Sequence, residues 1–309
     1  VDREELKVSK AKLISDKLRI PLLIVDCKEL FHEKVVKYFL EQYQKGYTPN
    51  PCVRCNQMVK FPIITKIAKE NLINLISTGH YVRIFRHKDH SFLVRAKDKS
   101  KDQSYFLSMI PNEILNRCIF PLGEFEKGLV LKEVMKSNLF ASPPKESQEV
   151  CFLSGRDYRE LFLYSLPGSQ EGPIVDMEGK VLGRHKGIFN YTIGQRKGLG
   201  IAFGEPLYVR EIRYRENQIV VAPKEGILRR EVPLGEIHWK VRFRNLLKAM
   251  RISGQIRYKQ LAAPGRLILG ERNRFFYDSP QWAITPGQAF VGYRCDILLM
   301  ASFIERDEG

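Results

Sequence analysis

Apolar residues in the first third of the chain follow two different patterns. They recur at near-helical spacing over Glu5–Leu18 and again over Val35–Tyr43, which predicts two amphipathic helices. Between them, Ile20–Val25 is an uninterrupted apolar stretch, which is typical of a strand buried on both faces of a sheet. A further helix is expected from about Phe61, followed by a short buried strand over Asn74–Ser77. This alternation of helices and strands favours a doubly wound parallel sheet.

Thr78, Gly79 and His80 directly follow the second predicted strand. Ligands of doubly wound proteins bind beyond the carboxyl ends of the strands. Because glycine has no side chain, Gly79 allows a ligand to approach the backbone closely. We therefore expect part of a binding site at these three residues.

The pattern changes at about residue 160, where helical periodicity gives way to short apolar segments separated by glycines. Such a pattern predicts small β-barrels or sandwiches. The fold class is therefore α/β plus β. We divide the chain into an α/β domain (1–160), a small β-rich central domain (161–228) and a C-terminal β-barrel (229–309).

Charge narrows the range of partners. The 309 residues include 51 Lys and Arg but only 35 Asp and Glu, which gives a net charge of +16. This excess favours a polyanionic partner such as nucleic acid, although solubility alone would also explain it. No apolar stretch approaches the ~20 residues of a membrane span, and the first ten residues contain no signal-peptide core, so we expect a cytoplasmic protein.

Two long stretches contain basic residues and no carboxylate. One lies between Glu178 and Glu205, and the other between Glu236 and Glu271. Alternation over Lys240–Arg244 would place these charges on one face of a strand, either in contact with an RNA backbone or simply solvated. Tyr258, in the second stretch, fits either a base-stacking residue or a core tyrosine.

The six cysteines are too few for a disulfide scaffold in a chain of this length. Three of them have apolar neighbours and are expected to be small buried residues: Cys27, Cys118 and Cys295.

Pro49 and Pro51 are expected to prevent a regular helix, so that Cys52 and Cys55, which form a C-x-x-C segment, lie at the mouth of the helix that follows. The helix terminus, Arg54 and Lys60 should favour their thiolates. The spacing alone fits a redox dithiol, half of a metal site or a structural pair.

Six motifs together carry a family resemblance. In order, TPNPCVRCNQMVKF, STGHYVR, KDQSYFL, SQEVCFL, GRHKGIFNYTIGQRKGLGI and TPGQAF resemble the MnmA family of tRNA-specific 2-thiouridylases, over nearly the whole chain. The resemblance implies an adenine nucleotide alpha-hydrolase-like first domain and ATP-dependent thiolation at C2 of the wobble uridine of tRNA. ATP, with Mg²⁺ expected, would adenylate the C2 oxygen, and a cysteine persulfide would deliver the sulfur.

The resemblance also assigns residues. It implies that Cys151 carries the persulfide, and that Cys55 attacks it and forms a transient disulfide. Gly79 would contact ATP. The implied target-base loop consists of Asn50, Pro51 and Cys52. The implied tRNA contacts are His80, Lys101, Asp102, Gln103, Arg257, Tyr258 and Gln288. The partners would be tRNA and a sulfur-donor protein or sulfide.

The chain departs from the family pattern at two points. The family begins with a strand and an SGGVDSS-type loop that binds the ATP phosphates, and no SGG-x-D occurs in these 309 residues. We therefore expect an incomplete first domain and weak ATP binding, or none, by this chain alone. Many members carry Asp where this chain has Cys52. The set Cys52, Cys55 and Cys151 would suit a [4Fe–4S] cluster as well as persulfide chemistry, and a passive replacement at Cys52 is the third reading.

Two other functions stay open. One is a non-catalytic tRNA-binding paralogue or fragment, which the missing loop favours and the retained cysteines oppose. The other is an iron–sulfur carrier or redox protein.

Overall fold

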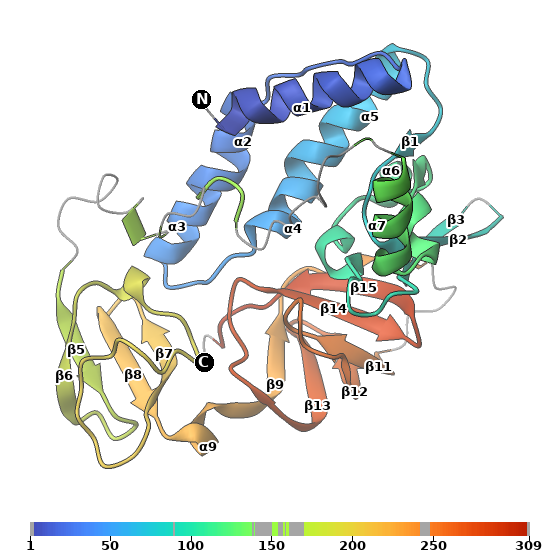
Figure 1. The fold of residues 1–309 in the computed structure, drawn as a ribbon. Coiled ribbons are helices and arrows are strands. Elements are labelled where there is room, and N and C mark those ends of the chain that lie inside the picture. Colours follow the sequence, from blue (N-terminus) through green and yellow to red (C-terminus); the bar gives the residue numbers. More distant parts are fainter. Residues whose placement is uncertain are drawn as a thin grey trace.

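A computed structural model describes residues 3–88, 90–137, 139, 150–153, 157, 159–160, 170–241 and 248–307. Three helical stretches open the chain (Figure 1). The first is α1 (Arg3–Leu18). The second joins α2 (Lys28–Phe31), the π-helical turn η1 (His32–Lys37) and α3 (Tyr38–Gln44). The third joins α4 (Pro51–Cys55), the π-helical turn η2 (Asn56–Lys60) and α5 (Phe61–Glu70). The first two predicted helices are confirmed, and the third begins ten residues earlier than predicted.

The predicted strand over Ile20–Val25 is wrong. These residues are not in a strand, and their large apolar side chains are exposed, up to 65% at Leu23. No described strand lies beside them to accept their backbone hydrogen bonds, and an apolar stretch cannot form a buried strand without such a partner. The predicted strand at Asn74–Ser77 is confirmed at its last two residues, where β1 (Ile76–Ser77) pairs in parallel with β4 (Cys118–Ile119).

The rest of the first domain connects directly to the C-terminal sheet. The hairpin of β2 (Val82–His87) and β3 (His90–Arg95) pairs with β15 (Ile297–Phe303) through Val94 and Ile297. Short helices follow the hairpin: η3 (Ser104–Leu107), α6 (Asn112–Leu115), η4 (Pro121–Glu124) and α7 (Lys127–Lys136). The sheet therefore continues from one end of the sequence to the other.

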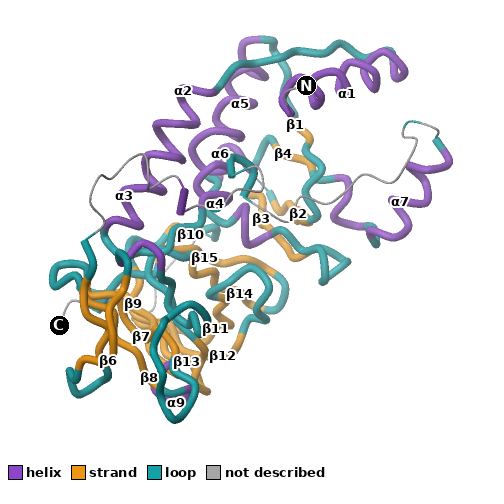
Figure 2. The backbone as a smooth tube through the Cα atoms, turned by 60° about the vertical axis from the view of Figure 1, so that its left-hand side comes forward, coloured by secondary structure: helices purple, strands orange, loops and turns teal. Residues whose placement is uncertain are grey.

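Two further sheets of strands form the second half, as predicted. The central sheet has the order β6-β5-β8-β7. Its elements are β5 (Gly172–Val175), β6 (Val181–His185), β7 (Tyr208–Arg213) and β8 (Gln218–Ala222), accompanied by η5 (Ile188–Asn190) and α9 (Lys224–Ile227). Figure 2 shows this sheet beside the C-terminal strands.

The C-terminal sheet is antiparallel, with the order β2-β3-β15-β14-β11-β12-β13-β9, and β10 also pairs with β15. Its remaining strands are β9 (Leu228–Leu234), β10 (His238–Trp239), β11 (Ala249–Gln255), β12 (Ala263–Ile268), β13 (Asn273–Trp282) and β14 (Ala289–Arg294). An isolated bridge between Leu234 and Ile304 brings the two ends of the C-terminal strands together, although the described ladders do not form a closed barrel.

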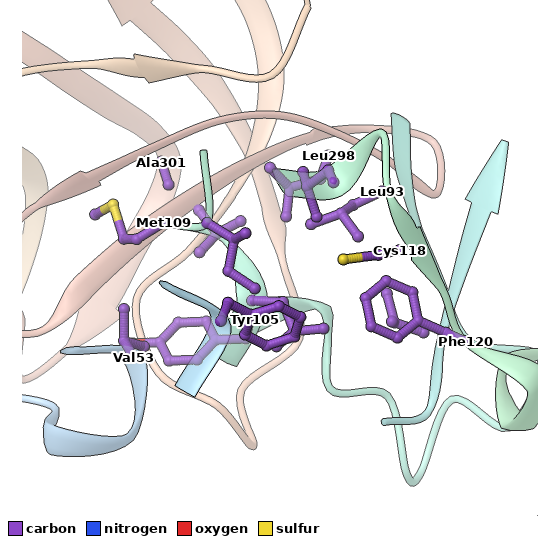
Figure 3. Close-up of a cluster of buried hydrophobic side chains, with 14 of the residues drawn as sticks. Val53, Leu93, Tyr105, Met109, Cys118, Phe120, Leu298 and Ala301 are labelled. Atoms are coloured by element: carbon purple, nitrogen blue, oxygen red, sulfur yellow. The ribbon is translucent and has the colours of Figure 1, made fainter. Parts of the chain in front are cut away.

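One hydrophobic core joins the third helical stretch to the C-terminal sheet (Figure 3). Val53, Tyr105, Cys118 and Leu298 are all buried in it. Cys118 is buried, as predicted. Cys295 is exposed, contrary to prediction, because it occupies the β14–β15 turn with a φ of +52°. No helix in the described part of the chain is long and apolar enough to cross a membrane.

Candidate catalytic cysteine site

Cys52 and Cys55 lie in the first turns of the third helical stretch. The side chain of Asn50 caps this helix by accepting a hydrogen bond from the backbone N–H of Val53 (3.2 Å), and Pro51 is its first residue. We predicted that the prolines would keep the helix from starting here, and that prediction is wrong. A proline is favoured at the first helical position, because the N–H that it lacks would have no partner there.

The C-terminal sheet holds the loop before this helix. The Gln288 side-chain amide donates to the carbonyl oxygen of Thr48 (2.8 Å), and the Thr48 N–H donates to that of Pro286 (2.9 Å). The Tyr105 hydroxyl donates to the Ala289 carbonyl (2.9 Å) and also interacts with the Asn50 side chain. The predicted target-base loop is therefore positioned by residues from distant parts of the sequence.

Cys151 is far from this helix in the sequence but lies beside it in the structure. Its side chain is exposed, and its neighbour Phe152 anchors it. The Phe152 ring makes edge contacts with Phe31 (5.8 Å between centroids) and Phe39 (5.4 Å), and it packs against the cluster that contains Cys55. Burial raises the pKa of both Cys52 and Cys55, and the charge of Cys151 adds to each increase, so the three thiols lie in the same region of the structure.

Burial controls the acidity of the helix cysteines. It raises the pKa of Cys55 to about 11, and it also raises the pKa of Cys52. Lys60 opposes both increases. Arg54 is not among the groups that act on these thiols, because its guanidinium stacks over the Tyr38 ring (4.6 Å). Lys60 favours the thiolates as predicted, but the expected net shift toward thiolate is wrong, since desolvation outweighs its effect.

In the ranges that the structure describes, no three His, Cys, Asp or Glu side chains are grouped so that they could hold a metal ion. The described cysteine positions therefore give no support to the [4Fe–4S] cluster, which stays a prediction.

The segment after β1 lies beside the helix. Gly79, the middle residue of the binding segment predicted at Thr78, Gly79 and His80, is exposed there. The Nδ1 atom of His80 is 2.8 Å from the Thr78 hydroxyl, and the His80 ring lies near those of Phe61 and Phe120. Burial, assisted by the charge of Lys60, lowers the pKa of His80 to about 4, so this imidazole is neutral at pH 7.

Two hydrogen bonds between Gln103 and Tyr81 connect the KDQ motif to this segment. The Gln103 side-chain oxygen accepts from the Tyr81 N–H (2.8 Å), and the Gln103 N–H donates to the Tyr81 carbonyl (2.8 Å). Asp102 is buried, accepts from Ser104 Oγ (2.7 Å), and lies 3.6 Å from the Arg95 guanidinium. Lys101 is half-buried. The contacts of Gln103 and Asp102 organise the loop, and direct contact of this motif with tRNA stays a prediction.

The side chains of Arg257 and Tyr258 make contacts with other residues of the protein. Arg257 donates to the Ala283 carbonyl and to Thr285 Oγ1, both at 2.8 Å. The Tyr258 ring lies against that of Phe106 (4.2 Å between centroids). The Tyr258 contact joins the C-terminal domain to the first domain, whereas these Arg257 bonds lie within the C-terminal domain. The predicted tRNA contacts of both residues stay predictions.

The two basic stretches differ in exposure. All five cations of the first are exposed: Lys180, Arg184, Lys186, Arg196 and Lys197. In the second, Lys240 is buried and donates to the Ile110 carbonyl, and burial lowers its pKa to about 8. The expectation that Lys240 lies on a charged outer face is therefore wrong. Arg242 and Arg244 lie outside the described residues.

The sequence analysis missed a cavity of about 700 Å³ between the central sheet, β9 and the end of α3. Its lining includes six arginines, namely Arg210, Arg213, Arg215, Arg229, Arg230 and Arg306. Five carboxylates also line it: Glu211, Glu216, Glu231, Glu305 and Asp307. Arginine recurs along β7 and at the start of β9, and this recurrence is the feature of the sequence that could have predicted an arginine-lined cavity.

Three family models match consecutive parts of the chain. They are described as a tRNA methyl transferase HUP domain (residues 3–155), a tRNA methyl transferase PRC-barrel domain (160–223) and an aminomethyltransferase beta-barrel domain (229–304).

Individual relatives match nearly the whole chain. A protein from Carboxydothermus hydrogenoformans named tRNA-specific 2-thiouridylase MnmA is 38% identical over 305 residues, covering 97% of this chain and 83% of the relative. A protein of the same name from Picosynechococcus is 40% identical, covering 96% of this chain and 85% of the relative. The tRNA-specific 2-thiouridylase MnmA 1 of Clostridium botulinum is 36% identical, covering 97% and 85%.

Proposed function

Because the chain belongs to the MnmA family of tRNA-specific 2-thiouridylases, we propose that it transfers sulfur to C2 of the wobble uridine of tRNA. The observation that carries this proposal is the meeting of exposed Cys151 with the helix that bears Cys55. An exposed thiol is accessible for loading with sulfur, and a second thiol beside it is needed to release that sulfur.

Cys151 is the persulfide carrier in this proposal. The buried Cys55 attacks the inner sulfur of the Cys151 persulfide, so that hydrosulfide leaves for the uridine and a Cys55–Cys151 disulfide remains. Bound ATP supplies an adenylyl group that makes the C2 oxygen a leaving group. Gly79, two residues beyond the end of β1 and exposed, is the proposed contact of this chain with the nucleotide, and Mg²⁺ is expected to bind with the nucleotide.

The target uridine is expected at the start of α4, where Asn50, Pro51 and Cys52 begin the helix. Access requires the base to leave its stack. The exposed cations of the central region and the arginine-lined cavity are the proposed contacts with the tRNA backbone. The sulfur donor is a partner protein or sulfide.

A thiolation assay tests the proposal. Purified chain is incubated with tRNA, Mg–ATP, cysteine and a cysteine desulfurase, and 2-thiouridine is measured by nucleoside mass spectrometry. At Mg–ATP concentrations high enough to offset the weak binding expected without the SGG-x-D loop, we expect product with the unmodified chain and none with Cys55→Ser or Cys151→Ser. Cys295→Ser is the matched control, because Cys295 is exposed in a turn between β14 and β15, and this variant should retain activity.

The outcome also separates the rival functions. Product that survives both cysteine substitutions would refute the assigned roles. Binding of tRNA with no product under any condition would favour the non-catalytic paralogue. Stoichiometric iron after anaerobic purification, lost on Cys52→Ser, would favour the iron–sulfur protein.

A further inference from the structure

We propose that Cys52 is a resolving thiol, which attacks the Cys55–Cys151 disulfide and returns Cys151 to its free form. This inference rests on the proposed function, because it concerns the disulfide that sulfur release leaves behind. It gives the C-x-x-C segment a redox role that requires no metal. The product is a disulfide between Cys52 and Cys55 within one helix.

The position of Cys52 suits this attack. Cys52 and Cys55 are three residues apart at the start of the third helical stretch, so they lie on one face with Cβ atoms about 5–6 Å apart. A disulfide needs about 3.5–4.5 Å between these atoms, so a small local shift is sufficient. The helix changes from α to π geometry directly after Cys55, where its backbone hydrogen bonds already depart from the regular α pattern.

Exposure differs along the three thiols. Cys55 is only 7% exposed, Cys52 is half-buried and Cys151 is exposed. Among the charged neighbours of Cys52, Cys151 has the largest effect on its pKa, ahead of Lys60. Cys151, the thiol that the exchange must release, is therefore the charged neighbour with the largest electrostatic effect on Cys52.

The exchange has a preferred direction. Attack of the Cys52 thiolate on Cys55 Sγ forms the Cys52–Cys55 bond, breaks the Cys55–Cys151 bond, and leaves the electron pair on Cys151 Sγ. The proton lost by Cys52 is taken up by Cys151 or solvent, so no external oxidant or reductant is consumed. Attack on Cys151 Sγ would instead expel Cys55, whose buried thiolate is disfavoured by its pKa of about 11, and weaker acids are poorer leaving groups.

The exchange separates reloading from reduction. Cys151 becomes free to accept another sulfur while the oxidising equivalents stay on the helix. A dithiol reductant then reduces the Cys52–Cys55 disulfide by two ordinary exchange steps.

Disulfide mapping tests the exchange without tRNA or ATP. The Cys295→Ser chain, in which an exposed competing thiol is absent, is treated anaerobically with one equivalent of Ellman's reagent. Disulfides are trapped with acid and N-ethylmaleimide and identified by peptide mass spectrometry. We expect the Cys52–Cys55 disulfide and a free Cys151. With Cys52→Ser added, we expect Cys55–Cys151 to accumulate.

Cys27→Ser is the matched control, because Cys27 is half-buried and packs against the same cluster as Cys55. It should give the map of the parent chain. Accumulation of Cys55–Cys151 while Cys52 is present, or a Cys27–Cys55 disulfide in place of Cys52–Cys55, would overturn the proposal. Equal thermal midpoints of the variants check that folding is unchanged.

Kinetics provide the second measurement. Because Cys52 also lies in the target-base loop, the multiple-turnover rate of each chain is divided by its own single-turnover rate without reductant. With a protein dithiol reductant, this ratio should be at least about tenfold lower in Cys52→Ser than in the parent chain, and high dithiothreitol should restore it. An unchanged ratio refutes the resolving role. Absence of product with the parent chain refutes the proposed function, and the mapping still decides the exchange.

Discussion

Burial sets the reactivity of the helix cysteines. A thiol with a pKa of about 11 is ionised in roughly one chain in 10,000 at pH 7, so Cys55 is inert until something favours its thiolate. Lys60 is the neighbour that does so, because it lowers the pKa of Cys52, Cys55 and His80 alike. An RNA phosphate near Lys60 would weaken this effect, so substrate position and thiol chemistry are electrostatically linked.

Replacing Lys60 with Met should raise the pKa of Cys55 further. The rate of alkylation by iodoacetamide follows the thiolate fraction, so it should rise with pH toward about 11 and be lower in the variant at each pH below that value. We expect a slowing of about threefold, which corresponds to half a pKa unit. Peptide mass spectrometry of Cys55 between pH 7 and 10 measures it.

Lys66→Met is the control for this experiment. Lys66 is exposed on the same helical stretch and lies 3.9 Å from Glu70, its ion-pair partner. Its removal should leave the alkylation profile unchanged. Equal rates in the Lys60→Met and parent chains would show that the cation does not act on Cys55.

At the scale of elements, the helical stretch from Pro51 to Glu70 carries the site. Its start is fixed by the Asn50 cap, and its middle contains the π-helical turn η2, which ends two residues before Pro62. A proline interrupts the regular α-helical hydrogen bonding, which the change of helical pitch accommodates. Cys52, Cys55 and Lys60 therefore take their relative positions from one continuous element.

Asn50→Ala should destabilise the chain by about 1–2 kcal/mol, because it removes the cap to Val53 and the contact with Tyr105. Urea denaturation followed by circular dichroism measures the free energy of unfolding. Asn50→Asp keeps an acceptor for the cap and should lose less. Asn71→Ala, at the exposed other end of the same stretch, removes only a bond to the Ile67 carbonyl and should change stability by less than about 0.5 kcal/mol. Equal losses at the two ends would contradict a special role for the cap.

The helices were predictable because their apolar spacing is a local property. Val35 and Phe39 are one turn apart, and both are buried as that spacing requires. The start at Pro51 was missed because proline was read only as a breaker, although an Asn–Pro pair is also a helix-start signal. The strand predicted at Ile20–Val25 was wrong because an apolar stretch does not show whether a neighbouring strand is present to pair with it.

The candidate site was predictable in its residue types and not in its electrostatics. Sequence shows that Lys60 is near Cys55, and the structure agrees. It does not show that Cys55 is buried by Val35, Val59 and Phe152, which belong to three different segments. Desolvation depends on that packing, so the sign of the pKa shift could not be read from local charges.

At the scale of the whole molecule, three joints hold the domains around the site. Gln288 bonds to Thr48, Tyr105 to Ala289, and Arg257 to the Ile193 carbonyl, each between two different domains. The arginine-lined cavity lies where the central sheet and β9 meet the end of α3. A tRNA backbone in this cavity would contact the same assembly that positions the target-base loop.

Arg229 and Arg230 carry the final prediction. Both are exposed at the start of β9, and neither has an ion pair within the described parts of the chain. Burial lowers the pKa of Arg210, and the charge of Arg229 lowers it further, so like charges lie close together at this rim despite the nearby carboxylates. A phosphate bound there would relieve this repulsion and release counterions.

The double variant Arg229→Gln, Arg230→Gln should therefore bind tRNA more weakly. Each lost phosphate contact reduces the slope of log K against log salt by about 0.7–0.9, so the pair should reduce it by roughly 1.5. Filter binding between 50 and 200 mM salt, roughly the range over which such contacts weaken, measures the slope. Arg251→Gln is the control, because Arg251 is exposed but paired with Asp278 at 2.6 Å, and it should leave the slope unchanged. An unchanged slope in the double variant would exclude the cavity rim from RNA binding and leave the exposed cations of the central region as the proposed backbone contacts.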